Sequence, residues 1–339
     1  MLLHWLKIIL KHLLPVSAKA KIRKLLLRLT GNRLPTTVRI EASTLCQLNC
    51  SACYMRKSNY GSMGKGYLKF FDFENFIQRN KFVKNIELSN SGEIFLNPDL
   101  IHIIKYAFEN NVKLSAGNGV NFNTVSDEII EALVKFCFRH ISISIDAASQ
   151  QIYSLYRTNG NFNTVIENIK KLNECKQKYN SKFPELTWQY IIMEHNEEDV
   201  IKAKKMAEQL GMRISFKLPW DDYVSQNKDM LIKETGLKCL SHKELFEAKK
   251  IIPNSNCYGL WSSPQINWDG RLLGCCVVYK DDFGVNVFDI GLKKAINSEN
   301  YKSAKKMLLG KVDVIQNTQN IPCIICEQYQ TMKETGIYV

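Results

Sequence analysis

The chain has 339 residues, of which 45% are hydrophobic and 23% charged. This is the ordinary balance of a folded globular protein and excludes extensive intrinsic disorder. The length predicts one large domain with an appendage. No uninterrupted apolar run is long enough to span a bilayer, because Lys7 and Lys11 break the longest candidate near the N-terminus.

The formal net charge of +13 is concentrated at the start of the chain. Eight basic residues lie within residues 1–33, and the first acidic residue is Glu41. Nucleic-acid binding usually requires basic residues spread over a folded face. We therefore expect no nucleic-acid partner.

The basic segment has the pattern of two amphipathic helices, Met1–Leu14 and Ala18–Leu29, separated by the helix breaker Pro15. Such helices can lie in a membrane interface or can pack on a domain with a solvated basic face, and both interpretations of residues 1–33 stay open. A signal peptide is disfavoured because no small-residue cleavage site follows. We expect a cytoplasmic protein, with peripheral contact to the inner face of the membrane as the open alternative.

From residue 37 onward, short β-branched runs alternate with helical stretches. The expected strands are Val38–Leu45, Asn85–Asn90, Val112–Ala116, Ile141–Asp146, Leu186–Met193 and Arg213–Leu218. The expected helices lie near residues 72–80, 98–110, 126–136, 162–178 and 197–210. Six strand–helix units in sequence predict an α/β fold, a partial (β/α)6 TIM-like barrel. Its functional residues would lie at the carboxyl ends of the strands.

Changes of pattern divide the chain into four parts. Residues 1–36 hold the basic helices, and residues 37–222 form the α/β core. Residues 223–252 are rich in Lys and Glu and are expected to connect the core to the remainder. Residues 253–339 hold five cysteines, and we expect them to form a small cysteine-rich α+β domain.

The chain contains eleven cysteines, an odd number, and most fall in closely spaced groups. Disulfide scaffolds are usually short with an even count, so metal-binding thiolates in a reducing compartment fit better. The first group, Cys46, Cys50 and Cys53, has the spacing C-x3-C-x2-C directly after the first expected strand. A [4Fe–4S] cluster normally takes four cysteines, so three would leave one iron open. Zinc is the alternative, but it prefers four ligands and no fourth is local.

The spacing of Cys46, Cys50 and Cys53 and its place after a strand resemble the radical S-adenosylmethionine (SAM) superfamily. The resemblance implies that SAM binds the open iron and that its reductive cleavage gives a 5′-deoxyadenosyl radical. That radical would abstract a hydrogen atom from the substrate. One departure is Ala52, because the family often has an aromatic residue just before the third cysteine. Here Tyr54 follows that cysteine instead.

Three further segments resemble SAM-binding motifs of this family. Ser91-Gly92-Glu93 resembles Gly-Gly-Glu, with serine in place of the first glycine. The fourth expected strand ends in Ser-Ile-Asp, and an arginine follows in a segment that resembles the one meeting the SAM carboxylate. The resemblance thus implies SAM contacts from Ser91, Gly92, Glu93, Ser144, Asp146 and Arg157. From the residues alone, a solvated acid at Glu93 and a surface ion pair at Arg157 remain alternatives.

Other polar residues lie at or beyond the expected strand ends. A tight turn is the favoured interpretation of Asn118, Asn121 and Asn123, with binding of hydroxyl groups as the alternative. A second set of residues could contact a substrate: Gln189, His195, Lys217 and Trp220. For His195, capping by the neighbouring Asn196 explains the loop more simply.

The second group of cysteines consists of Cys257, Cys275, Cys323 and Cys326. The hairpin signal Asp269-Gly270 would return Cys275 toward Cys257. The arrangement resembles the SPASM and twitch extensions of radical SAM enzymes, which implies one auxiliary [4Fe–4S] cluster on these four cysteines. From spacing alone, a zinc ribbon is the alternative.

Cys276 is left outside this set. Its favoured interpretation is a structural neighbour of the second group. The alternative, implied by resemblance to radical SAM epimerases, is a catalytic thiol that donates a hydrogen atom to a substrate radical.

The motifs together predict a radical SAM enzyme with two [4Fe–4S] clusters, SAM and an external one-electron reductant such as a flavodoxin or ferredoxin. One open class is oxidation or epimerisation of a sugar-like small molecule, which could be lipid-linked. The other is modification of a peptide or protein. Residues 1–36 show no strand pattern that a peptide could extend, which disfavours that second class. A zinc-binding protein without catalysis is the third alternative.

Overall fold

The computed structural model describes residues 33–59, 61–219, 225, 227–241, 244, 257–275, 281–311, 320–336 and 338–339. The predicted N-terminal helices, part of the connecting segment, Trp220 and Cys276 lie outside the described residues. An eight-stranded sheet has the order β6-β5-β4-β3-β2-β1-β7-β8. Its strands are β1 (Thr37–Ile40), β2 (Asn85–Glu87), β3 (Lys113–Val120), β4 (His140–Ser144), β5 (Glu185–Ile191), β6 (Arg213–Lys217), β7 (Gln265–Ile266) and β8 (Leu272–Gly274).

Helices follow the strands in regular alternation. The longer ones are α4 (Phe70–Arg79), α5 (Leu100–Glu109), α6 (Asp127–Lys135), α7 (Gln150–Tyr156), α8 (Phe162–Lys178), α9 (Val200–Gln209), α10 (Lys228–Thr235), α15 (Glu299–Leu308) and α16 (Glu327–Thr335). The short ones are α3 (Tyr54–Lys57), α12 (Gly259–Ser262), α13 (Val287–Ile290), α14 (Leu292–Ala295), η1 (Gly61–Met63), η2 (Ile94–Leu96), η3 (Glu194–Asp199) and η4 (Pro322–Ile325).

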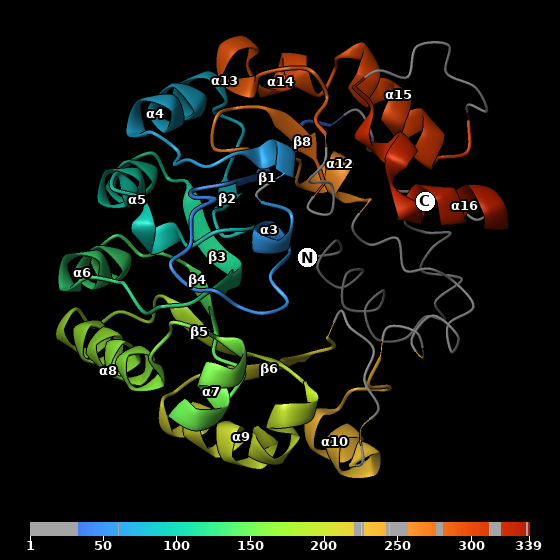
Figure 1. The fold of residues 1–339 in the computed structure, drawn as a ribbon. Helices are drawn as coiled ribbons and strands as arrows, with labels where there is room; N and C mark the ends of the chain where they lie inside the picture. The colour runs from blue at the N-terminus through green and yellow to red at the C-terminus, as the bar shows by residue number, and fades with distance from the viewer. Residues whose placement is uncertain are drawn as a thin grey trace, which may run out of the picture.

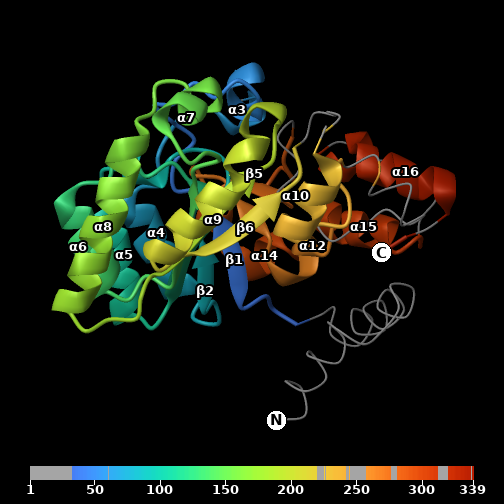
Figure 2. The same ribbon diagram turned by 90° about the horizontal axis from the view of Figure 1, so that it is seen from below.

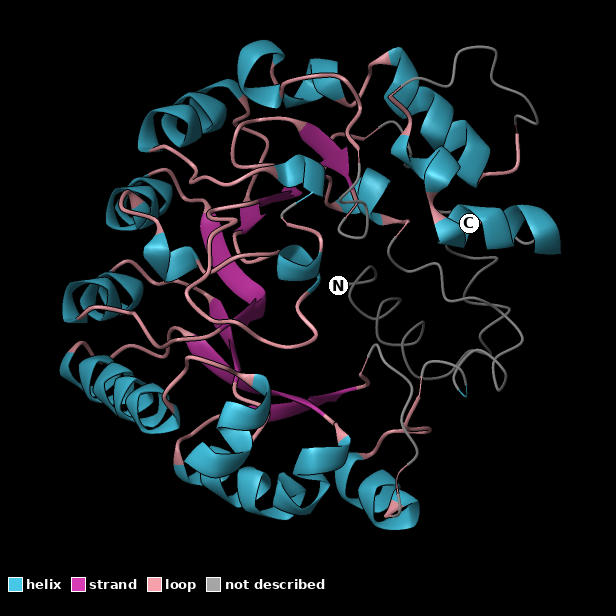
Figure 3. Ribbon diagram, viewed as in Figure 1, coloured by secondary structure: helices cyan, strands magenta, loops and turns pink. Residues whose placement is uncertain are grey.

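Strands β1 to β6 are parallel and pair with their neighbours in chain order. Figure 1 shows this part of the sheet as an open arc with α4, α5, α6, α8 and α9 along its outer side, and Figure 3 shows the same arrangement by element type. The predicted α/β fold with a parallel sheet is confirmed. Parallel pairing brings the carboxyl ends of all six strands to one mouth.

Side-chain alternation along the strands explains the two faces of the sheet. In β4, Ile141 and Ile143 are fully buried in the main hydrophobic core, which also holds the apolar residues of the outer helices. Ser142 and Ser144 of the same strand lie on the opposite, inner face. The strands therefore enclose a polar interior behind an apolar outer layer.

Two strand boundaries differ from the prediction. The first strand ends at Ile40 rather than Leu45, because the following residues leave the ladder and pair with loops, as when Ala42 donates to Leu88 O at 3.2 Å. The third continues to Val120 across a register shift that begins at Ala116. Both differences lie at the mouth, where the chain is shaped by tertiary contacts.

The segment from Cys257 onward extends the same sheet. β7 pairs with β1 in parallel, and β8 returns antiparallel to β7. The predicted hairpin forms, but its loop is wider than two residues, because Asn267 N pairs with Arg271 O at 2.9 Å. Figures 1 and 2 both place α15 and α16 on the opposite side of the molecule from α6 and α8.

Part of the predicted connecting segment is helical. α10 packs on α9, and Lys204 forms a 2.8 Å ion pair with Glu234. Within the described residues, none of the helices combines the length and apolar character needed to cross a membrane.

Candidate active site at the carboxyl ends of the strands

The loop after β1 carries Cys46, Cys50 and Cys53 and leads into α3. Its backbone is fixed at both ends, since Asn49 donates to Thr158 O at 2.9 Å and Cys53 donates to Cys50 O at 3.1 Å. The three thiols are half-buried. The predicted group of cysteines therefore lies at the mouth of the partial barrel, as expected for chemistry on this fold.

Burial keeps the thiols of Cys46 and Cys50 protonated while no cation is bound, and a bound cation would displace their protons. Burial, Glu93 and the neighbouring thiols raise the pKa of Cys46 to about 12. Burial also raises the pKa of Cys50, and Arg157, whose Nη1 lies 3.6 Å from Cys50 Sγ, opposes that shift. Buried sulfur donors that gain from positive charge match what iron requires of its ligands.

No group of three or more His, Cys, Asp or Glu side chains within the described ranges converges closely enough to hold a single metal ion. A cubane cluster is larger than one ion and holds its cysteine ligands further apart. The half-buried thiols are thus compatible with a cluster in their number, type and loop position.

The loop after β2 carries Ser91, Gly92 and Glu93 and packs directly against the cysteine loop. Glu93 N donates to Leu45 O at 2.8 Å. A side chain at Gly92 would place its Cβ 2.2 Å from Ser43 O, so no larger residue fits there without a backbone shift. Close packing of these two loops explains the glycine of this motif.

Glu93 is 1% exposed, so the solvated-acid interpretation is wrong. Its Oε1 accepts from Phe95 N at 3.2 Å and its Oε2 accepts from Asn121 N at 2.6 Å. Burial raises the pKa of Glu93 to about 7, although these amides oppose the shift. The carboxylate thus ties the loop after β2 to the end of β3.

Sequence reasoning missed a second buried acid, Glu41, immediately after β1. It is 0% exposed, and its Oε1 accepts from Ser91 N at 3.2 Å and Gly92 N at 3.4 Å. Its Oε2 has no hydrogen-bond partner among the described residues. Burial raises its pKa to about 7. No motif marks this glutamate, and only its place at the end of an inner-face pattern could have suggested it.

Asp146 and Arg157, both predicted to bind SAM, pair with each other. Arg157 Nε donates to Asp146 Oδ2 at 2.7 Å, and Nη2 contacts the same oxygen. The arginine side chain is 11% exposed and the aspartate 1%, so the surface ion pair is excluded as an interpretation. The remaining Arg157 nitrogen faces Cys50. The pair places a guanidinium beside the first group of cysteines.

The backbone of Asp146 is held in an unusual conformation. Its φ of 57° lies in the left-handed region that favours glycine. Asn196 Nδ2 donates to Asp146 O at 2.8 Å, and Ile191 N donates to Asp146 Oδ1 at 2.7 Å. Asn196 Oδ1 also accepts from Met193 N at 2.8 Å, the cap-type contact predicted for this loop. His195 Nε2 is buried without a partner among the described residues.

Two asparagines after β3 reach the cysteine loop and its supports. Asn121 Nδ2 lies 3.6 Å from Cys46 Sγ, and its Oδ1 accepts from Asn123 N at 3.0 Å, which is the predicted turn contact. Asn123 Nδ2 donates to Tyr153 OH at 2.9 Å. The turn interpretation therefore holds for Asn121 and Asn123, and this turn supports the first cysteine, but it is wrong for Asn118, which lies within β3.

The four cysteines of the second group come from three separate segments and lie near enough for the other three to influence the charge on Cys323. Burial raises the pKa of Cys323, and Cys275, Cys257 and Cys326 add to that shift, in that order. Cys257, Cys275 and Cys323 are buried, and Cys326 is half-buried. Cys276 lies outside the described residues, so its predicted role remains open.

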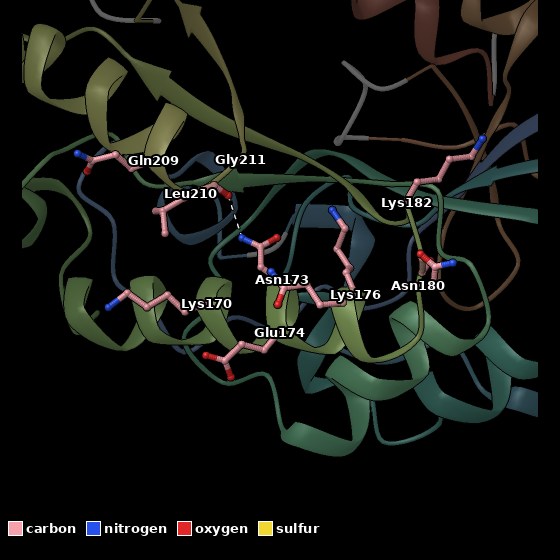
Figure 4. A pocket seen from close by; sticks show the side chains of 11 residues that line it. Lys170, Asn173, Glu174, Lys176, Asn180, Lys182, Gln209, Leu210 and Gly211 are labelled. Atoms are coloured by element: carbon pink, nitrogen blue, oxygen red, sulfur yellow. Dashed lines mark hydrogen bonds between the residues drawn. The ribbon is translucent and has the colours of Figure 1, made fainter.

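A shallow concavity of about 750 Å³ lies at the other end of the barrel. Figure 4 shows it between the end of α8 and the segment that follows α9, where Asn173 Nδ2 donates to Leu210 O at 2.8 Å. Lys176 and Lys182 line it. Because these segments precede β5 and β6, the concavity is remote from the cysteine loops.

The fold resembles solved structures over most of its length. SuiB from Streptococcus suis bound to S-adenosylmethionine is 14% identical, with a TM-score of 0.60 over 92% of this chain and 74% of SuiB. SuiB bound to precursor peptide SuiA is 14% identical, with a TM-score of 0.62 over 94% and 76%. SuiB itself is 15% identical, with a TM-score of 0.61 over 94% and 79%. At these identities the likeness concerns the fold alone.

No curated protein sequence matches the chain. Residues 40–207 match the radical SAM superfamily. This range begins at the last residue of β1 and contains β2 to β5, the first group of cysteines and the predicted SAM-binding segments. Membership implies a [4Fe–4S] cluster and SAM. Residues 40–207 are therefore a domain of the radical SAM superfamily.

Proposed function

We propose that this chain cleaves SAM reductively and abstracts a hydrogen atom from a hydroxylated, sugar-like substrate, which it oxidises or epimerises. The observation that carries the proposal is the placement of Cys46, Cys50 and Cys53 at the barrel mouth with Arg157 3.6 Å from Cys50. When bound, a [4Fe–4S] cluster on these cysteines would supply an electron and an open iron for SAM.

The described residues divide the binding of SAM among them. The loop Ser91–Glu93 offers backbone groups at the mouth. Glu41 accepts from the amides of Ser91 and Gly92, and the Glu93 carboxylate accepts from the amides of Phe95 and Asn121. Arg157 holds Asp146 with Nε and Nη2 and directs Nη1, which can donate to a carboxylate, toward the cysteine loop. Ser144 offers a hydroxyl on the inner face. We propose SAM contacts for Ser91, Gly92, Glu93, Ser144, Asp146 and Arg157.

We also propose that Cys257, Cys275, Cys323 and Cys326 hold a second [4Fe–4S] cluster, in a SPASM- or twitch-like region that begins near residue 253. Support comes from the mutual influence of these thiols on the pKa of Cys323. Four cysteine ligands would leave no open iron, which favours a role in electron transfer over substrate binding. Zinc in this site is the competing assignment.

The polar inner face of the sheet supports a hydroxylated substrate. Gln189 and Lys217 join Ser144 there, and Gln189 Nε2 donates to Ser144 Oγ at 3.0 Å. The alternative is a peptide substrate, supported by the solved complex of SuiB with a precursor peptide. An external one-electron reductant of the flavodoxin or ferredoxin type completes the proposal.

The first experiment measures iron, sulfide and zinc in anaerobically purified wild type and in the triple Cys46/Cys50/Cys53→Ala variant. We expect about eight irons in the wild type and about four in the variant. SAM cleavage to 5′-deoxyadenosine under dithionite should occur only in the wild type. Zinc without sulfide, or unchanged iron in the variant, would contradict the radical mechanism.

Contact with a membrane through residues 1–33 is a separate proposal, and those residues lie outside the described ranges except for Arg33. It rests on eight basic residues that precede the first acid. Full-length protein should sediment with anionic vesicles at low salt and should be released at high salt. Equal recovery with neutral vesicles would contradict it.

A further inference from the structure

Two groups of hydrogen-bonded side chains lie along the inner face of the sheet just below the barrel mouth. At one end, Arg39 Nη1 of β1 donates to Asn90 Oδ1 at 3.2 Å. Asn118 Nδ2 of β3 donates to the same oxygen at 2.9 Å. Asn90 Nδ2 is buried and has no hydrogen-bond partner among the described residues.

The second group of hydrogen-bonded side chains belongs to the last three parallel strands, β4 to β6. Lys217 Nζ of β6 donates to Gln189 Oε1 of β5, and Gln189 Nε2 donates to Ser144 Oγ of β4 at 3.0 Å. The backbone of Gly119, next to Asn118, lies close to the second group, since a Cβ there would lie 2.3 Å from Ser144 Oγ. We call this set, Arg39, Asn90, Asn118, Ser144, Gln189 and Lys217, the polar belt.

The polar belt carries a positive charge at each end. Neither Arg39 nor Lys217 has a carboxylate within 4 Å in the described ranges. Burial lowers the pKa of Lys217, against the fields of Asp146 and Glu87, while Arg157 adds to the lowering. A partly buried ammonium without a counter-ion is costly. The belt is therefore arranged to receive negative charge.

The neighbouring carboxylates are committed to other partners. Glu87 Oε2 accepts from Ser115 Oγ at 2.7 Å, and its Oε1 accepts from Gly117 N at 2.7 Å. Asp146 is paired with Arg157. The amide and hydroxyl groups between the two cations can satisfy the hydroxyls of a ligand, which neither an apolar nor a cationic substrate would require.

We propose that the polar belt binds a hydroxylated substrate bearing an acidic group, phosphate or carboxylate, whose charge is met by Arg39 and Lys217. This inference rests on the proposed function and names its substrate class. Guanidinium and ammonium groups both bind such oxyanions, and the arginine does so with two parallel hydrogen bonds.

The test measures binding of three probes to anaerobic, SAM-loaded enzyme by calorimetry. The probes are glucose 6-phosphate, gluconate and neutral glucose, so the arms separate phosphate from carboxylate. We expect at least one acidic probe to bind at least tenfold more tightly than glucose. The Arg39→Gln/Lys217→Met variant should lose that preference, and Lys217→Arg should retain it.

The matched control is Lys176→Met/Lys182→Met, which removes lysines from the concavity at the opposite end of the barrel. Equal binding of glucose, a preference that survives the belt variant, or a preference lost only in the control would overturn the inference. Loss of SAM binding in the belt variant, measured by equilibrium dialysis, would reassign the cations to SAM and also overturn it.

Iron content and SAM cleavage are measured on the same preparations, with thermal unfolding as the check on folding. Normal SAM cleavage without preferential binding of an acidic probe would contradict the proposed substrate class but not the proposed function. Absence of iron and of cleavage in the wild type would sink the proposed function itself.

Discussion

Replacing Glu41 by Gln should remove a large part of the chain's loss of stability as pH rises toward neutrality. The carboxyl group is 0% exposed and accepts two backbone N–H groups on one oxygen. The other oxygen has no partner among the described residues. Burial of an ionised group in this setting is costly, so the folded chain holds the proton that the unfolded chain releases.

The sign and size of this change in stability with pH follow from the pKa of Glu41. Burial raises it from 4.5 to about 7. The stability due to this group is complete below pH 4.5, falls as pH rises, and is lost above about pH 7. The pKa thus rises by about 2.5, and at about 1.36 kcal/mol for each pKa unit this corresponds to about 3.4 kcal/mol of stability. Glu93, whose pKa is also raised to about 7, adds a change of the same sign.

The assay is denaturant unfolding from pH 4.5 to 8.5 of the wild type, Glu41→Gln, Glu93→Gln and the double variant, under reducing conditions. The free-energy difference between wild type and Glu41→Gln should change by up to about 3 kcal/mol across this range. Burial lowers the pKa of His140 and of His195, so their contribution makes stability rise with pH. This contribution is the same in every variant and therefore cancels in the free-energy differences. A difference that stays constant with pH would refute the reasoning.

Four further changes test the site. Gly92→Ala should weaken SAM binding in equilibrium dialysis at least tenfold, because its Cβ would lie 2.2 Å from a backbone oxygen, and unchanged affinity would contradict the packing. Arg157→Lys should also weaken SAM binding at least tenfold, because a lysine cannot hold Asp146 and face the cysteine loop at the same time, and unchanged affinity would contradict a SAM contact from this side chain. Cys326→Ala should lower iron content by up to about four per chain, and no loss would exclude this ligand. Trp268→Phe should cost about 1 kcal/mol in denaturant unfolding, through its lost 2.9 Å bond to a carbonyl.

The parallel sheet could be predicted from the sequence because its outer face obeys a local rule. In strands such as β4, apolar residues that pack against helices alternate with polar ones, and α6 is capped by Ser126, whose hydroxyl accepts from Ile129 N at 3.3 Å. Periodicity and capping are properties of neighbouring residues. The position of Cys46, Cys50 and Cys53 at the mouth then follows from their place after a strand.

The inner face was harder to predict because its contacts join residues far apart in the chain. Glu41 binds amides 50 and 51 positions away, and Glu93 binds one 28 positions away. A lone glutamate carries no spacing signal, so neither its burial nor its partners could be inferred. The pairing of Asp146 with Arg157 was missed for a different reason, since each had been assigned separately to SAM.

The hairpin of β7 and β8 links the two groups of cysteines physically. Three donors from it, Asn267 Nδ2, Trp268 Nε1 and Arg271 Nη2, converge on Met63 O at 2.9, 2.9 and 3.3 Å. Leu273, two residues before Cys275, packs in a small apolar cluster with Met55 and Met63 that also touches Cys53.

This contact changes how the C-terminal region is best understood. A separable appendage would leave the β1 edge complete without it, but β7 supplies the parallel partner of β1 on that side. Removing the hairpin would expose that edge and leave the carbonyl of Met63 without its three donors. The hairpin therefore forms part of the wall around the first group of cysteines. A shift of β8 at Leu273 would move the apolar cluster that Cys53 packs against, as well as Cys275.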